Sequence, residues 1–230
     1  VSETDNPIEI TWWHSMSGDN GSHIDKLVED FNNSQSDIQV EAVYQGSYAD
    51  SLAKLMASLQ GGDGPTLMQA NFVSTATLID SGAVAPMQYF IDNENYDLSQ
   101  LEENILANFQ YQGKLFSMPF NASTLIMYYN KDMFEDKGLD PDNPPKTYEE
   151  LLDVAKQLTG DGKYGASFGI DSWFIEQLIA VQGFEIVDNG NGREGRAEKS
   201  LLNSEGAIKT FNMWKEMIEK GYMLNLGSNN

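Results

Sequence analysis

IEITWW (Ile8–Trp13) opens the stretch of sequence that decides the fold, because its β-branched and aromatic residues are typical of a strand. Apolar residues then recur three and four positions apart between Ile24 and Phe31, which is the spacing of one helix face. IQVEAVY (Ile38–Tyr44) follows, with apolar and polar residues alternating as in a half-exposed strand. The order strand, helix, strand indicates two parallel strands joined by a crossover helix.

A second crossover unit extends this pattern. Ser47 and Asp50 stand three positions apart and predict a helix cap, after which the apolar residues between Leu52 and Leu59 form one stripe. The glycine pair that begins at Gly61 ends this helix, and TLMQA (Thr66–Ala70) has the composition of a third strand. We therefore predict a βαβαβ unit built on a parallel sheet.

The rest of the first half is expected to hold two more helices and a hairpin. One helix spans Ser74–Ser81 and ends at Gly82, and a second has helical spacing over Leu98–Phe109. Gln112–Gly113 then turns the chain into a strand at Lys114–Pro119.

A second α/β cluster fills the remainder of the chain. Thr147 with Glu150 forms a capping box, which predicts the start of a helix. The predicted elements are, in order, a strand at Leu125–Tyr129, a helix through Leu158, a strand at Tyr164–Ile170, a helix at Ser172–Gln182, a loop at Asp188–Arg196, and a helix whose buried stripe is Ile208, Phe211, Trp214 and Ile218. Two α/β clusters that join near Ser117–Ser123 predict a cleft at the carboxyl ends of strands, where such folds bind ligands.

Composition excludes several classes of function. The 230 residues include 14 Lys and Arg against 35 Asp and Glu, which gives a formal net charge of −21. A chain this acidic repels polyanions, so nucleic acid and anionic membrane surfaces are not expected partners. The absence of cysteine excludes disulfides, thiolate metal sites and cysteine nucleophiles. No apolar run reaches the roughly 18 residues that a membrane span needs.

Catalytic and metal motifs in the sequence are incomplete. Gly165–Gly169 matches G-x-S-x-G, but the histidine of an α/β-hydrolase follows its serine, and His14 and His23 both lie upstream. Asp188–Gly192 resembles a calcium loop in which glycines replace two oxygen ligands. We therefore expect no catalytic residue, no metal and no cofactor, with a hydrolase or a glycosidase acting on sugars as the alternative function.

Aromatic residues gather where the predicted strands end and helices begin. They are Trp12, Trp13, Tyr44, Tyr48, Phe72 and Trp173. Sugar rings pack their C–H faces on aromatic rings, while polar side chains bond the hydroxyls. For each aromatic residue, packing in the core remains the competing interpretation, and it is their grouping at strand ends that favours a ligand site.

Short motifs along the whole chain point to one family. They are WHSM (Trp13–Met16), YQGSY (Tyr44–Tyr48), STAT (Ser74–Thr77), PFNAST (Pro119–Thr124), YYNKD (Tyr128–Asp132), GLDP (Gly138–Pro141) and PPKT (Pro144–Thr147). Together they resemble the family 1 extracellular solute-binding proteins of ABC importers. The resemblance implies an α/β fold of the type II periplasmic-binding-protein class, in which two lobes close over a small-molecule solute and present it to the permease subunits in the membrane.

The resemblance also implies the organisation and location of the chain. Members of the family are longer, so the sequence resembles an amino-terminal part, with incomplete lobe 1 at residues 1–118 and the crossing segment and incomplete lobe 2 at residues 119–230. We expect uncovered apolar edges that favour self-association. An exported protein is expected, either periplasmic or a cell-surface lipoprotein. A surface adhesin that uses the lobes only as a scaffold is a further alternative.

Ligand residues follow from the resemblance position by position. Members that bind glycerol phosphate have a tyrosine where Tyr48 stands and a serine where Ser123 stands, and both match. They have a glutamate at the position of Phe72 and a tryptophan at that of Gly169, one helical turn before Trp173. The change to Phe72 replaces a charge-assisted hydrogen bond with a stacking surface, which favours a sugar or a glycerophosphodiester over glycerol 3-phosphate. The expected ligand site is Trp13, Tyr48, Phe72, Ser123 and Trp173.

Overall fold

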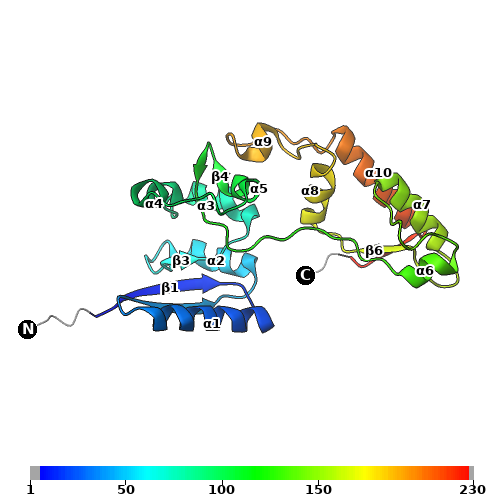
Figure 1. The fold of residues 1–230 in the computed structure, drawn as a ribbon. Helices are drawn as coiled ribbons and strands as arrows, with labels where there is room; N and C mark the ends of the chain where they lie inside the picture. The colour runs from blue at the N-terminus through cyan, green and yellow to red at the C-terminus, as the bar shows by residue number, and fades with distance from the viewer. Residues whose placement is uncertain (1–5, 228–230) are drawn as a thin grey trace, which may run out of the picture. The chain divides into compact units, whose positions relative to one another are not determined.

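The computed structural model describes residues 6–227 and consists of two units (Figure 1). The first unit ends at Ala122 and the second begins at Ser123. Across residues 6–227 no helix combines the length and the apolar character that crossing a membrane requires.

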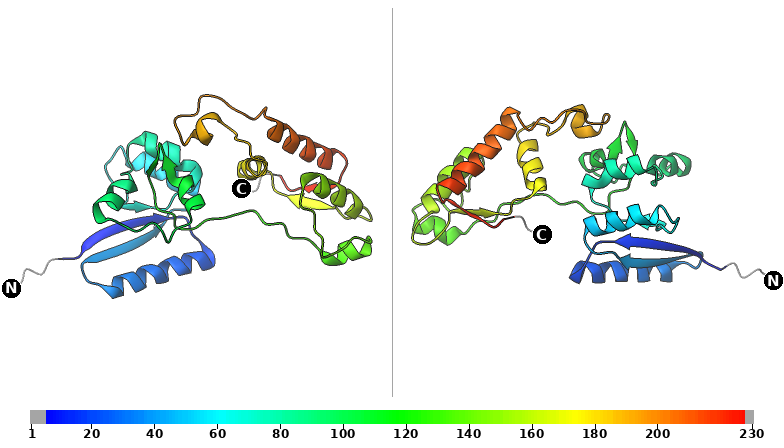
Figure 2. Two further views of the ribbon diagram at one scale, coloured as in Figure 1. Left: turned by 45° about the horizontal axis from the view of Figure 1, so that its top comes forward. Right: turned by 180° about the vertical axis from the view of Figure 1, so that it is seen from behind.

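A three-stranded parallel sheet organises the first unit. Its strands are β1 (Ile8–His14), β2 (Ile38–Tyr44) and β3 (Leu67–Met68), and its crossover helices are α1 (Gly18–Ser34) and α2 (Tyr48–Ser58). The order in the sheet is β2-β1-β3, and α1 and α2 cover opposite faces (Figures 1 and 2). The predicted βαβαβ unit is therefore confirmed, although β3 is shorter than the predicted Thr66–Ala70.

The two helices of this unit follow their sequence signals to different degrees. At α2 the capping box forms as predicted, since Ser47 Oγ accepts from Asp50 N at 3.2 Å and Asp50 Oδ2 accepts from Ser47 N at 3.0 Å. On α1 only Ile24 of the predicted stripe is buried, while Leu27 and Phe31 are exposed. The narrow sheet covers only part of the helix face.

Two amide side chains of α1 and its C-cap occupy the outer edge of β2. Asn32 Nδ2 donates to Val40 O and Asn32 Oδ1 accepts from Val40 N, both at 2.9 Å. Gln35 Nε2 donates to Ile38 O at 2.7 Å and Gln35 Oε1 accepts from Ile38 N at 2.8 Å. Each amide thus pairs with both backbone groups of one residue, as a neighbouring strand would.

The remainder of the first unit is a small layer of short elements. They are the 3₁₀ turns η1 (Phe72–Ser74) and η2 (Ala107–Phe109), the helices α3 (Thr75–Ser81), α4 (Met87–Glu94) and α5 (Glu103–Leu106), and the hairpin β4 (Gln110–Tyr111) and β5 (Lys114–Leu115). Ile91, Leu106 and Leu115 form their core.

Turn chemistry accounts for the predictions that succeed in this layer. Gly82 ends α3 in the left-handed conformation, and the hairpin turns at Gln112 and Gly113, both with positive φ. The predicted helix over Leu98–Phe109 is wrong in extent, because only α5 and η2 form within it.

The second unit packs three helices on a two-stranded parallel sheet. Its elements are α6 (Lys131–Asp136), α7 (Tyr148–Leu158), β6 (Ala166–Phe168), α8 (Ser172–Ala180), α9 (Asp188–Gly192), α10 (Glu205–Glu219) and β7 (Met223–Asn225). β6 pairs with β7, and α7 and α10 lie side by side (Figures 1 and 2). The core contains Ala155, Met213, Trp214, Met217 and Met223.

Two predictions in the second unit are wrong. Leu125–Tyr129 is not a strand, because no segment of residues 6–227 pairs with it; its Tyr128 is 88% exposed. On α10, Ile208, Phe211 and Ile218 are exposed, and the buried face carries Thr210, Met213, Trp214 and Met217. Of the predicted stripe only Trp214 is buried, so the helix presents a different face to the core than the sequence pattern indicated.

Close packing at Gly165 joins β6 to α7. A Cβ atom at this position would collide with the backbone carbonyl group of Ala155 in α7. Gly165 N donates to Tyr222 O at 2.9 Å and to Thr159 Oγ1 at 3.1 Å, which fixes the approach. The first glycine of the G-x-S-x-G match therefore serves packing.

Candidate functional site

Three of the expected ligand residues lie at one edge of the first unit's sheet. Trp13 stands near the end of β1, Tyr48 is the first residue of α2 after β2, and Phe72 is the first residue of η1 after β3. Because β1, β2 and β3 are adjacent and parallel, their carboxyl ends share an edge, which is where open α/β sheets bind ligands.

Tyr48 and Phe72 are both partly buried at this edge. Burial raises the pKa of Tyr48 above its ordinary value, so its hydroxyl is protonated at neutral pH and can donate a hydrogen bond. Next to Phe72, Asn71 Oδ1 accepts from Ser74 Oγ at 2.5 Å, which stabilises the η1 turn. The edge therefore presents a donor and an aromatic surface.

An aromatic cluster, which we define as Trp12, His14, Tyr44 and Phe120, lies at the same end of the sheet. Ring centroids are 6.0 Å apart for Trp12 and His14, 5.8 Å for His14 and Tyr44, and 5.6 Å for Trp12 and Phe120. Side chains alternate along a strand, so Trp13 points to the opposite face. The alternation of Trp12 and His14 was the sequence signal for this cluster, and the expected site omitted it.

Polar side chains join the ends of β1 and β3 beside the aromatic cluster. Ser15 N donates to Gln69 Oε1 at 3.1 Å, and Gln69 Nε2 donates to Asn121 Oδ1 at 3.4 Å. Gln69 is buried. Two further buried atoms, His14 Nδ1 and Ser15 Oγ, have no hydrogen-bond partner within residues 6–227.

His14 is held as a neutral imidazole. Burial lowers its pKa below the ordinary value of 6.5. The Asp25 charge and a hydrogen bond with the Met16 backbone act in the opposite direction. Only 3% of the residue is exposed. A neutral imidazole offers one donor and one acceptor nitrogen.

The buried His14 predicts a pH dependence of stability. As pH falls below 6.5, the unfolded chain takes up a proton that folded His14 resists, so the free energy of unfolding should decrease until the lowered folded-state pKa is passed. Urea denaturation at a series of pH values measures this slope. His14→Gln should remove this contribution to the pH dependence, while the control variant His23→Gln, at an exposed position, should retain it. Equal slopes in all three proteins would contradict the prediction.

Trp173 and Ser123 belong to the second unit. Trp173 is the first residue of α8, and its backbone N–H donates to the N-cap Asp171 at 2.7 Å. Its ring lies 5.7 Å from that of Phe174, and its buried Nε1 has no hydrogen-bond partner among residues 6–227. Ser123 is exposed. Both positions remain predictions for the ligand site.

A carboxylate lies on the same helix as Trp173. Glu176 stands three residues later, a spacing that places two side chains on one helix face. Burial raises the pKa of Glu176, an effect that the Arg193 charge opposes and the Asp171 charge supports. Gly169, the position where related proteins were expected to have tryptophan, is buried.

The serine of the G-x-S-x-G match and the two histidines lie in different units. Ser167 lies in β6 of the second unit, whereas His14 and His23 both lie in the first unit. Among residues 6–227 no group of three or more His, Asp or Glu side chains could hold a metal ion. Asp188–Gly192 instead forms α9, with left-handed backbone angles at Asn189, Gly190 and Asn191.

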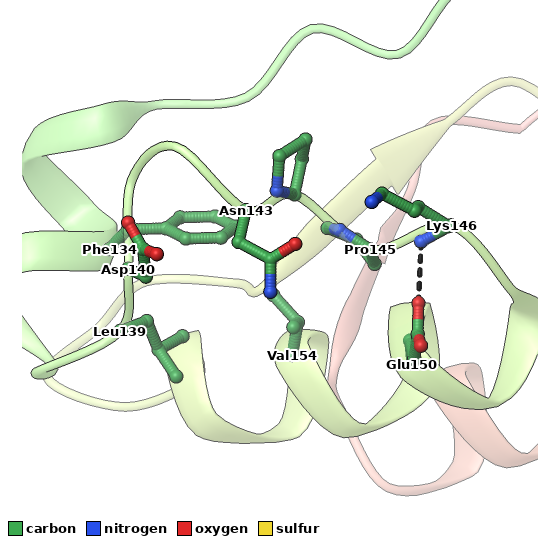
Figure 3. Close-up of a pocket in the computed structure, with 9 residues that line it drawn as sticks. Phe134, Leu139, Asp140, Asn143, Pro145, Lys146, Glu150 and Val154 are labelled. Carbon is green, nitrogen blue, oxygen red and sulfur yellow. Dashed lines mark hydrogen bonds between the residues drawn. The ribbon is translucent and has the colours of Figure 1, made fainter.

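A surface pocket of about 310 Å³ lies elsewhere in the second unit (Figure 3). Phe134, Leu139 and Val154 form its apolar floor, and the loop that carries Pro144 and Pro145 also lines it. Among its polar lining residues, Glu150 is part of the α7 cap, since its Oε2 accepts from the backbone N–H of Lys146 at 2.7 Å.

A parallel sheet with aromatic and amide side chains at its carboxyl edge, followed by a second α/β unit, agrees with the two-lobed class of binding protein that the sequence resembles. The family model described as bacterial extracellular solute-binding protein matches residues 26–230. The chain belongs to this family.

Curated relatives are more than a third identical to the chain over the stretch that matches. It is 37% identical over 219 residues to the sn-glycerol-3-phosphate-binding periplasmic protein UgpB of Yersinia pseudotuberculosis, covering 93% of this chain and 50% of the relative. The identity to UgpB of Salmonella typhimurium is 35% over 218 residues, or 92% and 50% of the two chains. The chain thus spans about half the length of the curated relatives it matches.

Solved structures show the same fold. UgpB from Mycobacterium tuberculosis in complex with glycerophosphocholine superposes with a TM-score of 0.79 at 21% identity, covering 95% of this chain and 57% of that one. The cyclic alpha-maltosyl-1,6-maltose binding protein from Arthrobacter globiformis gives a TM-score of 0.74 at 23% identity, covering 96% and 56%. The expected periplasmic-binding-protein class is confirmed.

Proposed function

We propose that the protein is the substrate-binding component of an ABC importer and captures a carbohydrate or a glycerol-phosphate-type solute. The observation that supports this proposal is the shared carboxyl edge of β1, β2 and β3 in a member of this family, because Trp13, Tyr48 and Phe72 each stand near the carboxyl end of one of these strands. The relatives named above are binding proteins, and we propose that this chain likewise binds its solute without catalysis.

The proposed mechanism is hinge closure. In it, Tyr48 donates to or stacks on the solute, Phe72 forms the floor, and Trp13 contributes from the end of β1. Ser123 and Trp173 supply the contacts from the second unit. The solute stabilises the closed state by its higher affinity for that state, which is the only way in which a ligand can shift such an equilibrium.

Charge favours an uncharged solute or one whose phosphate is partly masked. The formal net charge of −21 creates a field that repels anions. Phe72 offers a ring where a carboxylate would otherwise hold hydroxyl groups. A sugar meets no electrostatic barrier at such a site, whereas free glycerol 3-phosphate would need local cations to overcome it.

The proposed partners and location follow from the family. The loaded receptor would deliver its solute to the permease subunits of the transporter. We propose an exported protein that acts either in the periplasm or as a lipoprotein at the cell surface.

Ligand binding tests the proposal through Tyr48. Thermal-shift and calorimetric measurements on the chain would use a panel of oligosaccharides, glycerophosphocholine and glycerol 3-phosphate. We expect one solute class to bind, and Tyr48→Ala to weaken it about tenfold, because one hydrogen bond and one ring contact are lost.

Tyr96→Ala is the matched control for this measurement, since Tyr96 is 57% exposed and lies beyond the end of α4. Its affinity should equal that of the wild type. No binding to any member of the panel would overturn the solute class, and unchanged affinity in Tyr48→Ala would overturn the site.

A further inference from the structure

A buried glutamine directly after β3 connects three parts of the first unit. Gln69 is 6% exposed, and its backbone N–H donates to Trp13 O at 2.8 Å. Its side-chain Oε1 accepts from Ser15 N at 3.1 Å, and its Nε2 donates to Asn121 Oδ1 at 3.4 Å. One side chain therefore joins the ends of β1 and β3 to the segment that leads out of the first unit.

The orientation of the Gln69 amide follows from its partners. A backbone N–H can only donate, so Ser15 N must face Oε1, and the amide nitrogen is thereby turned to Asn121. Buried polar groups are nearly always bonded, so this nitrogen needs an acceptor at the position of Asn121. Asn121 itself is exposed, which means that the buried partner determines the bond.

Asn121 and its neighbour Phe120 are the last residues that the sheet holds. The ring centroid of Phe120 lies 5.6 Å from that of Trp12 on β1, and Asn121 is held by Gln69. The first unit ends one residue later, at Ala122. A ring contact and a hydrogen bond therefore fix the same point of the chain.

Beyond this point the chain runs through several residues without a hydrogen bond. Within the described residues 6–227, residues 122–128 make no hydrogen bond and form no helix or strand (Figure 1). Tyr129 is the next residue to be held, because its hydroxyl donates to Pro141 O at 3.0 Å. Backbone rotation within residues 122–128 would break no hydrogen bond, as a pivot requires.

We propose that Gln69 is a positioning residue for closure, because through Asn121 it fixes the point at which the chain leaves the first unit. The pivot then begins at Ala122. This inference rests on the proposed function, since closure is the motion that the pivot serves. Gln69 acts through the backbone that leads to Ser123, the expected ligand residue two positions after Asn121. A fixed exit point increases the fraction of molecules in which Ser123 is placed to meet the solute.

Backbone ¹⁵N relaxation tests the anchoring without any solute. At residue 121 we expect an order parameter of about 0.85 in the wild type, as in rigid backbone, and a value below about 0.6 in Asn121→Leu. Asn121→Asp should restore the wild-type value, because a carboxylate also accepts from Gln69 Nε2. Gln69→Met, which keeps the length of the side chain but removes its amide, should match Asn121→Leu.

Asn104→Leu is the matched control, since Asn104 is an exposed asparagine on α5 of the same unit. It should leave the order parameter at residue 121 unchanged, and circular dichroism would establish that each variant is folded. Equal order at residue 121 in the wild type and in Asn121→Leu would overturn the proposal. A loss of order in Asn121→Asp as large as in Asn121→Leu would also overturn it, because the acceptor would then not be the cause.

Solute affinity, measured by calorimetry with the panel named above, separates the positioning role from the proposed function. For a solute that binds, Asn121→Leu should weaken affinity about threefold to tenfold, while Asn104→Leu should leave it unchanged. Binding with equal affinity in the wild type and in Asn121→Leu would overturn the positioning role while the proposed function stands. No binding by any member of the panel would overturn the proposed function, and the relaxation result would then decide whether Gln69 anchors the segment.

Discussion

Replacing Gly165 with alanine is expected to lower the free energy of unfolding of the second unit by more than about 3 kcal/mol. A Cβ atom there would overlap the carbonyl group of Ala155, which is backbone within α7 and cannot rotate away. Relief would require β6 to move from α7, and that movement would break the bonds from Gly165 N to Tyr222 and Thr159.

Urea denaturation followed by circular dichroism measures this effect, and Gly195→Ala is its matched control. Gly195 lies in the same unit, and the nearest atom to an added Cβ is Asn189 Nδ2 at 4.0 Å. The control should change stability by less than about 1 kcal/mol. If Gly165→Ala were as stable as Gly195→Ala, the close contact between β6 and α7 would be wrong.

Truncating Phe134 to alanine is expected to lower the free energy of unfolding by about 3–5 kcal/mol, the usual range for removing a buried phenylalanine. Phe134 is 2% exposed and its ring lies 5.2 Å from that of Tyr129. It also forms part of the floor of the pocket in Figure 3, so the variant would enlarge an existing hollow. The loss of the contacts that the buried ring makes with its neighbours accounts for the expected cost.

Phe211→Ala is the control, because Phe211 is on α10 of the same unit and is 37% exposed. Phe211→Ala should lower the free energy of unfolding much less than Phe134→Ala does. The comparison uses the midpoint of thermal or urea unfolding in each variant. If both variants lost the same free energy of unfolding, Phe134 would not be the residue that anchors α6 to the rest of the second unit.

Local signals predicted the fold where a few neighbouring residues determine the structure. The capping boxes at Ser47 and Thr147 form as read, because they need only residues three positions apart. The helix α4 was not predicted, since it lacks a side-chain cap and has only eight residues. The strand at Leu125–Tyr129 failed because a strand exists only with a partner, which composition alone does not reveal.

The candidate site, too, was predictable only where residues close in sequence determine it. The positions of Tyr48 and Phe72 at strand ends followed from the βαβαβ order, whereas the bond between Ser15 and Gln69 joins residues 54 positions apart. No periodicity encodes such a pair. His14 was readable as the neighbour of Trp12 on one strand face, but its burial and its ring contact with Tyr44 of β2 were not.

The amide groups of Asn32 and Gln35 determine at which edge a further strand can add to the first unit's sheet. Because they already bond Ile38 and Val40, the β2 border is closed over that stretch to any further polypeptide. The opposite border, at β3, carries no such side-chain plug within residues 6–227. Any strand that joins this sheet, from whatever source, is therefore directed to the β3 side, so two identical sheets cannot pair through β2 without first displacing these amides.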